Sequence, residues 1–227
     1  GHVDFTAEVE RSLRVLDGLI VVFDAREGVE AQSETVWRQA DKYKIPRICF
    51  INKMDRIGAD FEHSVSSIRK RLSIAPVPVQ FPIGASGTFE GLVDLIAMRA
   101  VYYNVQALGS TQEEREIPES LRAQAEQMRH DLLEAASEYS DALMDKYLAD
   151  KPVAPEEIRK ALRTATLRRE LTPVLCGSSL RYIGVQRMLD AVCDFLPSPL
   201  DAPPVPAKDA KRPEVEHEFA SDPNGPL

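Results

Sequence analysis

The chain has 227 residues, of which 44% are hydrophobic, and a formal net charge of −8 at pH 7. This length and apolar content suffice for one large domain, or for a domain that carries an insert, with a core of ordinary size. Neutralising the phosphates of a nucleic acid requires an excess of Lys and Arg, so the acidic balance argues against a protein that binds mainly in that way. It leaves open a local basic patch, or a partner that is itself partly protein.

The three cysteines, Cys49, Cys176 and Cys193, lie among apolar residues and form no C-x-x-C pair. An odd number without such a pair predicts neither a disulfide framework nor a zinc site. Buried free thiols are typical of a reducing compartment. The sequence contains no apolar run of 18 residues and no visible signal peptide, so no segment is expected to span a membrane.

Helices and strands alternate in the first part of the chain. Residues 3–16 carry apolar residues at helical spacing and predict a helix, and the continuous apolar run at 18–25 predicts a strand covered on both faces. A second helix is predicted over 31–43, a second buried strand over 47–51 and an amphipathic helix over 60–72. This order is typical of parallel βαβ units, so we expect an α/β fold whose open, mostly parallel sheet has flanking helices.

The pattern changes after a third strand candidate at 77–83. Residues 89–104 are rich in β-type residues and predict an antiparallel hairpin, whereas 111–170 are polar, charged and helical, with a helix start at Pro155. The α/β pattern then returns as a short strand at 171–176 and a helix at 183–196. The organisation that we predict is a core of 1–85 and 171–196 with an inserted α+β subdomain over 86–170.

The stretch 48–55 reads ICFINKMD, so a buried strand ends in an amide, a cation and a carboxylate. In open α/β sheets, ligands bind beyond the carboxyl ends of the strands. Guanine presents its N1–H and 2-amino groups as two parallel donors, which the carboxylate of Asp55 can accept together. Adenine would leave that carboxylate unpaired, and sites of this kind discriminate by roughly 10⁴–10⁵-fold.

The neighbouring residues of this stretch have further roles in the same hypothesis. The stem of Lys53 can lie over the base, and Asn52 can join neighbouring loops, while Met54 completes the motif as a spacer whose side chain points away. The four-residue pattern alone is also common at strand-ending turns. Its position directly after a buried strand favours guanine binding.

Two more stretches are compatible with a nucleotide site. Ser178 and Ser179 follow the last strand, and their backbone N–H groups can donate to guanine O6; an ordinary strand-to-helix turn is the alternative. At the start of the chain, Gly1 can donate its N–H to a terminal phosphate and His2 can position a water for in-line attack. A surface histidine or a cloning remnant is the alternative there.

Taken together, these stretches, with AQSETVWRQA and DFLPSPLD, resemble the GTPase domain of bacterial-type translation elongation factor G. The resemblance runs through essentially the whole chain, including the insert, and is strongest over 1–61 and 172–203. It implies a P-loop GTPase-like fold, with GTP or GDP and Mg²⁺ as cofactors of the parent protein. It also implies the ribosome, through its rRNA and ribosomal proteins, as the partner, with neither a membrane nor DNA.

The resemblance also implies roles for individual residues. Gly1 matches the last residue of the family's Asp-x-x-Gly phosphate loop, and His2 matches the catalytic histidine that orders the attacking water. The stretch from Asn52 to Asp55 matches the guanine-specificity motif. Ser178 matches the serine of the second guanine loop. The family usually has Ala where this chain has Ser179, a mild change because that contact is made by the backbone.

Several family features are missing from these 227 residues. The sequence has no G-x-x-x-x-G-K-[ST] phosphate loop and no first switch with its magnesium ligand, so no metal ligand is assigned. The dense prolines over 197–227 predict a linker toward a missing β-barrel domain. We therefore expect a fragment, truncated at its N-terminus and itself inactive, of a GTPase that promotes translocation of tRNA and mRNA.

Other functions stay open at this point. The parent protein could be a paralogue for ribosome recycling or rescue, or the acidic helices of 111–170 could serve a non-catalytic module that docks a basic partner. An unrelated α/β metabolic enzyme is disfavoured, because the sequence has no G-x-G-x-x-G motif and no Ser-His-Asp arrangement. A bacterial cytoplasm is the expected location, and an organellar matrix fits as well.

Overall fold

The structure is a computed structural model that describes residues 6–104, 111–201, 204–208, 216–219, 221–222 and 225. The chain divides into two compact units, Gly1–Leu196 and Pro197–Leu227. The elements of the first unit are, in order, α1 Thr6–Leu13, β1 Leu19–Asp24, α2 Ala31–Lys42, β2 Arg47–Asn52, α3 Phe61–Leu72, β3 Pro76–Pro78, β4 Gln80–Ile83, a 3₁₀ turn at Ser86–Thr88, β5 Gly91–Asp94, β6 Arg99–Tyr103, β7 Gln112–Arg115, α4 Glu119–Ser137, α5 Asp141–Leu148, α6 Pro155–Arg168, β8 Thr172–Cys176 and α7 Val185–Phe195.

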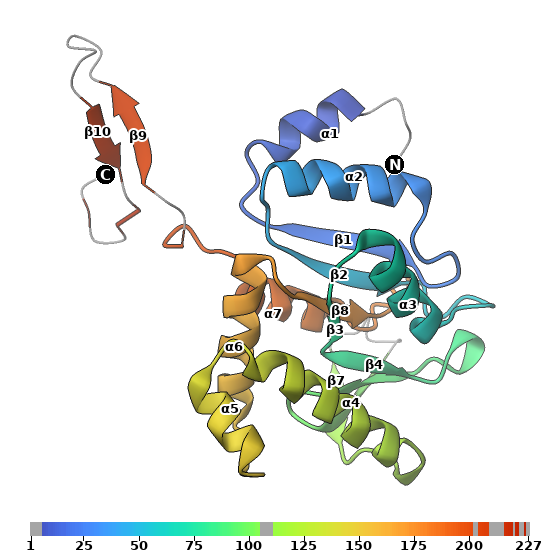
Figure 1. Cartoon of the computed structure of the whole chain (residues 1–227). Coiled ribbons are helices and arrows are strands. Elements are labelled where there is room, and N and C mark those ends of the chain that lie inside the picture. Colours follow the sequence, from blue (N-terminus) through green and yellow to red (C-terminus); the bar gives the residue numbers. More distant parts are fainter. Residues whose placement is uncertain are drawn as a thin grey trace. The chain divides into compact units, whose positions relative to one another are not determined.

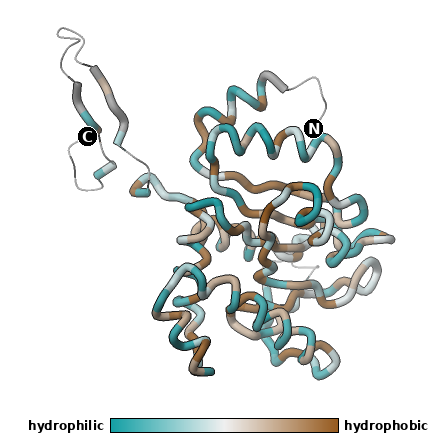
Figure 2. The backbone as a smooth tube through the Cα atoms, viewed as in Figure 1, coloured by the Kyte–Doolittle hydropathy of each residue, from teal (hydrophilic) through white to brown (hydrophobic). Residues whose placement is uncertain are grey.

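A parallel sheet of four strands, in the order β1-β2-β8-β3, forms the centre of the first unit (Figure 1). Every residue of β8 is buried, and so is every residue of β2 except the last. Brown segments in the parallel sheet in Figure 2 reflect the apolar runs that predicted these strands. The α/β fold with a parallel sheet and flanking helices is therefore confirmed, with an additional antiparallel sheet.

β1 lies at an edge of this sheet and pairs with β2 from Leu19 opposite Arg47 to Asp24 opposite Asn52. The expectation that it is covered on both faces is wrong. Phe23 is 1% exposed, but Ile20 and Val22, which point to the other face, are 36% and 56% exposed. An apolar run shows that a strand forms, but it does not show that a helix covers each face.

The helices begin where capping residues and apolar spacing predict them. In α3, the Asp60 side chain accepts a hydrogen bond of 2.8 Å from the backbone N–H of His63, which satisfies one of the free donors at the helix start. The helix ends at Ser73, whose φ of 52° is left-handed. α6 begins at Pro155, as predicted, and the Glu157 side chain accepts a hydrogen bond of 2.9 Å from the N–H of Ala154.

The strand predicted over 77–83 is divided between two sheets. β3 pairs in parallel with β8, whereas β4 begins an antiparallel sheet of order β4-β5-β6-β7. Val79 joins them: its N–H donates to the carbonyl of Val174 at 3.1 Å, and its own carbonyl accepts from the N–H of Leu95 at 3.0 Å. One residue therefore passes the chain from the parallel sheet to the antiparallel one.

The antiparallel sheet and three helices form the region that was predicted as an insert. β5 and β6 confirm the hairpin predicted within 89–104. The region 111–170, predicted as helical, contains α4, α5 and α6 but begins with the strand β7, whose four residues are all exposed. The sheet also includes β4, which precedes residue 86, so the predicted boundary and the sheet do not coincide.

The second unit contains a short two-stranded antiparallel sheet. β9 Val205–Lys208 pairs with β10 Glu216–Phe219, with Val205 opposite Phe219 and Lys208 opposite Glu216. These strands lie within the Pro-rich region that composition predicts as a linker. Proline is tolerated in such strands because each has a free edge.

Candidate functional site

Two loops meet at the carboxyl edge of the parallel sheet. β2 and β8 are adjacent, with Ile51 opposite Cys176, so the residues that follow them leave the sheet side by side. Backbone hydrogen bonds continue past the strands: the N–H of Gly177 donates to Ile51 at 2.9 Å, and the N–H of Met54 donates to Gly177 at 3.1 Å. The two stretches that the sequence singled out, 52–55 and 177–180, are therefore brought together.

The side chain of Asn52 ties these loops to each other. Its oxygen accepts hydrogen bonds from the backbone N–H of Ser179 at 2.9 Å and from the Ser179 hydroxyl at 3.1 Å. It also accepts one from the N–H of Lys53 at 2.8 Å. With the oxygen engaged in this way, the amide NH₂ group remains as a donor at the edge of the sheet.

Lys53 has a left-handed backbone, with a φ of 67°, and a half-exposed side chain. Its ammonium lies 2.6 Å from a carboxylate oxygen of Asp24, the last residue of β1. Burial opposes ionisation of Asp24, but the hydrogen bonds from Lys53 and from the N–H of Arg26, with the charge of Lys53, lower the pKa of this carboxyl below its ordinary value. The Asp24 carboxylate is therefore ionised at neutral pH.

Asp55 and Met54 have opposite environments. Asp55 is partly exposed, and among the described residues no hydrogen bond or ion pair engages its carboxylate. Two acceptor oxygens are thus available to a ligand. The Met54 side chain is fully buried in the core, as expected for a spacer, so Met54 can meet a ligand only through its backbone.

The loop after β8 differs in detail from the sequence hypothesis. The N–H of Ser178 donates to the carbonyl of Ile183 at 2.9 Å, and the N–H of Ser179 donates to Asn52. Both groups are therefore engaged within the chain and are not free donors for a base. Leu180 was missed: within the described part of the chain its N–H has no partner, and its apolar side chain is 74% exposed.

Gly177 allows the close approach of the two loops. A Cβ atom at this position would lie 2.3 Å from the carbonyl oxygen of Ile183 and 2.8 Å from the ring of Phe50. No side chain fits at such distances, so the turn requires glycine for space. Asp24 is the other residue that sequence reasoning missed, although its place at the end of a predicted strand was a usable signal.

Two predicted site residues cannot be placed. Gly1 and His2 lie outside the described residues. The described stretches contain no group of three or more His, Cys, Asp or Glu side chains arranged to hold a metal ion. In the same stretches, no helix has the length and apolar character needed to cross a membrane.

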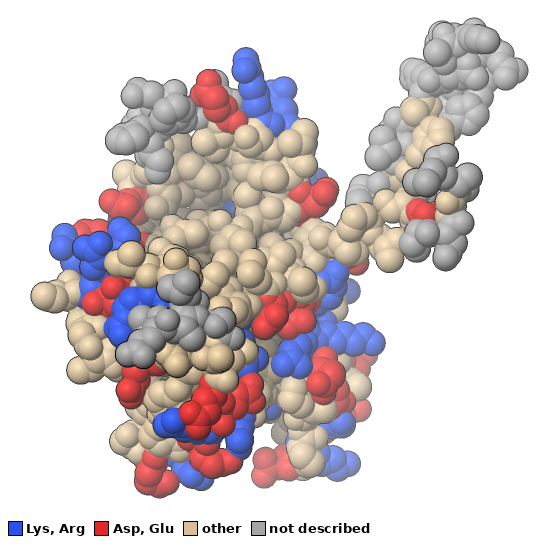
Figure 3. Space-filling model, turned by 180° about the vertical axis from the view of Figure 1, so that it is seen from behind, with Lys and Arg blue, Asp and Glu red and all other residues tan. Residues whose placement is uncertain are grey.

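A cavity of about 400 Å³ adjoins the loops. Its lining includes Asp24 and Lys53, together with Arg26, Glu27, Arg56 and Ile57. Both charge signs are present, so the cavity suits a polar ligand more than an apolar one. Acidic and basic side chains are also interspersed over the face of the molecule in Figure 3.

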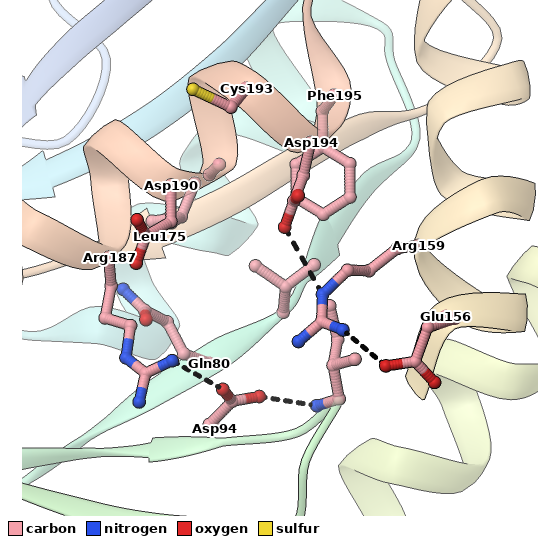
Figure 4. Close-up of a pocket in the computed structure, with 13 residues that line it drawn as sticks. Gln80, Asp94, Glu156, Arg159, Leu175, Arg187, Asp190, Cys193, Asp194 and Phe195 are labelled. Carbon is pink, nitrogen blue, oxygen red and sulfur yellow. Dashed lines mark hydrogen bonds and ion pairs between the residues drawn. The ribbon is translucent and has the colours of Figure 1, made fainter. Parts of the chain in front are cut away.

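A second cavity of about 460 Å³ lies between α6, α7 and β5 (Figure 4). Most of its charged side chains engage one another: Arg159 is 3.3 Å from Asp194 and 3.5 Å from Glu156, and Arg187 is 3.8 Å from Asp94. Burial, opposed by Arg159, raises the pKa of Asp194. These contacts hold three elements together, and we interpret this cavity as structural.

The chain is similar to known proteins over most of its length. The family model of the elongation factor Tu GTP binding domain matches residues 1–198. Elongation factor G of Thermotoga petrophila is 56% identical over 205 residues, which are 90% of this chain and 29% of that protein. Elongation factor G of Amoebophilus asiaticus is 52% identical over 229 residues, which cover 97% of this chain and 32% of that protein.

One solved structure is also similar to this chain. A crystal structure of a protein from Thermus thermophilus matches with a TM-score of 0.77 and 30% identity, and covers 90% of this chain and 31% of the other. The chain thus spans about a third of the length of these relatives. It belongs to the family of the elongation factor Tu GTP-binding domain, and it is similar over most of its length to elongation factor G.

Proposed function

We propose that this chain is the guanine-reading part of the GTPase domain of a ribosome-dependent translation factor. The observation that carries the proposal is the meeting of Asn52, Lys53 and Asp55 with the loop at Ser179, at the carboxyl edge of a parallel sheet. The family membership and the similarity to elongation factor G support it.

Each group would have a distinct part in reading the base. The free carboxylate of Asp55 would accept from guanine N1–H and the 2-amino group. The half-exposed stem of Lys53 would lie against one face of the ring. The NH₂ group of Asn52 and the free N–H of Leu180 are donors for N7 and O6. Ser178 and Ser179 would act by shaping the loop, because their own N–H groups are engaged.

Phosphate binding and hydrolysis would depend on other groups. His2 is proposed to order the attacking water, and the N–H of Gly1 to contact the terminal phosphate. The sequence contains no G-x-x-x-x-G-K-[ST] loop, and phosphate and magnesium contacts supply most of the affinity for GTP. We infer that the 227-residue chain by itself binds guanine nucleotides weakly and does not turn them over. Ribosome-stimulated release of phosphate by this chain would refute that inference.

The parent activity that we propose is GTP-driven translocation of tRNA and mRNA on the ribosome, in a bacterial cytoplasm. The two relatives named as elongation factor G support it. For a longer protein that contains this chain, the direct measurement is ribosome-dependent phosphate release together with movement of the mRNA by one codon. Phosphate release with subunit splitting instead of mRNA movement would favour the recycling paralogue.

The base-reading proposal can be tested on the chain itself. The ¹⁵N-labelled chain is titrated with GMP, IMP and AMP at millimolar concentrations, and the backbone amide shifts are followed by NMR. We expect GMP to shift the amides of 52–55 and 179–180, IMP to bind more weakly because it lacks the 2-amino group, and AMP to leave them unchanged. Equal responses to GMP and AMP would contradict guanine recognition.

A further inference from the structure

We infer that Asp24 is a positioning residue for guanine nucleotides: it holds the ammonium of Lys53 and thereby orders the stem on which the base would rest. The inference deepens the proposed function and rests on it. It concerns a residue of β1, outside both guanine loops.

Asp24 is itself fixed by the turn that follows β1. One carboxylate oxygen accepts the N–H of Arg26 at 3.0 Å, and the backbone carbonyl of Asp24 accepts the N–H of Gly28 at 2.8 Å. The N–H of Ala25 donates to the carbonyl of Asn52 at 2.9 Å and so ties this turn to the end of β2. The carboxylate is therefore an anchor whose position relative to the guanine motif is set by the backbone.

Lys53 is held at both ends. Its N–H donates to the Asn52 side chain at 2.8 Å, and its ammonium meets the second oxygen of Asp24 at 2.6 Å. A free lysine side chain populates many rotamers, and ordering it when a ligand binds costs conformational entropy. Because the ion pair orders the stem in the absence of nucleotide, that cost is reduced at the binding step.

The exposures of the two side chains suit this role. The Asp24 side chain is 23% exposed and that of Lys53 is 50% exposed, so the anchor is shielded while the stem keeps a free surface. Water still screens the pair in part, which limits its effect. We expect loss of Asp24 to weaken binding of GMP by about two- to fivefold, the range of a partly exposed ion pair.

The experiment compares four variants of the chain with the original. Asp24→Asn keeps the shape and the acceptor for Arg26 but removes the charge. Lys53→Met keeps an apolar stem without the ammonium, and a third variant combines the two. Glu34→Gln is the matched control, because Glu34 pairs with Arg71 at 2.6 Å, its side chain is 24% exposed, and it lies on α2 outside both guanine loops. GMP affinity is measured by NMR titration, and the order of the Lys53 ammonium by ¹⁵N relaxation.

The expected outcome is that Asp24→Asn weakens GMP binding, Glu34→Gln leaves it unchanged, and the double variant binds like Lys53→Met alone, because Asp24 acts through Lys53. Additive losses, or an Asp24→Asn variant that binds like the original, would overturn the inference while guanine binding itself stands.

The relaxation measurement needs no nucleotide. We expect the ammonium of Lys53 to be more ordered than that of Lys70, which is exposed and has no ion pair among the described residues, and to lose this order in Asp24→Asn. Equal mobility of the two ammonium groups in the original chain would overturn the inference even where no nucleotide binds.

Discussion

The side-chain oxygen of Asn52 accepts two hydrogen bonds from Ser179, although the two residues are 127 positions apart in the chain. Asn52 is thus the direct side-chain link between the two loops. We expect Asn52→Ala to lower the free energy of unfolding by about 0.5–1.5 kcal/mol, the net contribution of a hydrogen bond whose donors remain accessible to water.

The Asn52→Ala variant is measured by urea unfolding and by amide hydrogen exchange at Ser179. Exchange at Ser179 should become faster, while exchange in β8 changes little. Asn52→Asp, which keeps an oxygen acceptor, serves as the control and should retain protection at Ser179. Unchanged exchange in the alanine variant would show that the link is not formed in solution.

Asp55 decides which purine is bound, if the proposed function holds. In Asp55→Asn one acceptor becomes an N–H donor, which no longer matches the 2-amino group of guanine but matches the 2-oxo group of xanthine. We expect GMP binding to fall by at least about tenfold and XMP binding to appear, measured by the same NMR titration. Glu62→Gln, an exposed change on α3, should alter neither. A variant that still prefers GMP would remove Asp55 from base recognition.

Gly177 and Gly87 differ in the space that is available for a side chain. A Cβ at Gly177 would collide with the carbonyl of Ile183 and the ring of Phe50. A Cβ at Gly87 would have no atom within 4 Å. We expect Gly177→Ala to destabilise the chain by about 1–3 kcal/mol and to shift the amides of the second loop. Gly87→Ala should be neutral or slightly stabilising. Equal thermal unfolding of the two variants would contradict the close approach.

Arg47 is buried at the start of β2, with 4% of its surface exposed. It donates to the carbonyls of Trp37 and Ile45, pairs with Asp41 at 2.7 Å, and lies 4.4 Å from the centre of the Trp37 ring. Lys has one compact ammonium and cannot make these contacts together, so Arg47→Lys should cost about 1–3 kcal/mol of unfolding free energy.

The control for this prediction is Arg38→Lys on α2, where the side chain is 81% exposed and the change should be close to neutral. Chemical denaturation of both variants decides the comparison. If Arg47→Lys is as stable as Arg38→Lys, the planar contacts of Arg47 do not contribute to stability.

The Asp24–Lys53 pair predicts a pH dependence. The pKa of Asp24 is lowered from its ordinary value of 3.8 because, against the effect of burial, the folded state favours the charged form. The stabilisation of the folded state by the ionised Asp24 is therefore fully present above pH 3.8. It is lost as the pH falls below that value through the lowered pKa. At about pH 7 the chain should exceed Asp24→Asn in stability by about 0.2–1 kcal/mol. The difference should shrink as the pH falls below 3.8, and a constant difference would contradict the ion pair.

Much of the fold could be predicted because local signals were strong. Apolar runs located β2 and β8, and the proline at 155 located the start of α6. The exposed face of Ile20 and Val22 could not be predicted, because exposure depends on which element packs against the strand. The division at Val79 depends on hydrogen bonds to Val174 and Leu95, and those are distant in sequence.

Weak local signals explain the other differences between the predicted and the observed structure. β7 has no apolar alternation, since all four of its residues face solvent at the edge of a sheet. At the candidate site, residue identities predicted which stretches meet. They could not predict which N–H groups are already engaged, so Ser178 and Ser179 were expected as donors and Leu180 and Asp24 were missed. Hydrogen-bond partners are set by three-dimensional packing, which a motif does not record.

The pairing of β2 with β8 has a consequence for how such a site tolerates change. Neighbouring strands lie about 4.8 Å apart because backbone hydrogen bonds fix that interval, whatever the side chains are. Both loops start from this pair, so the backbone fixes the distance between their first residues. Loop sequences can then diverge, as with serine at position 179, without altering the distance between the points where the two loops begin.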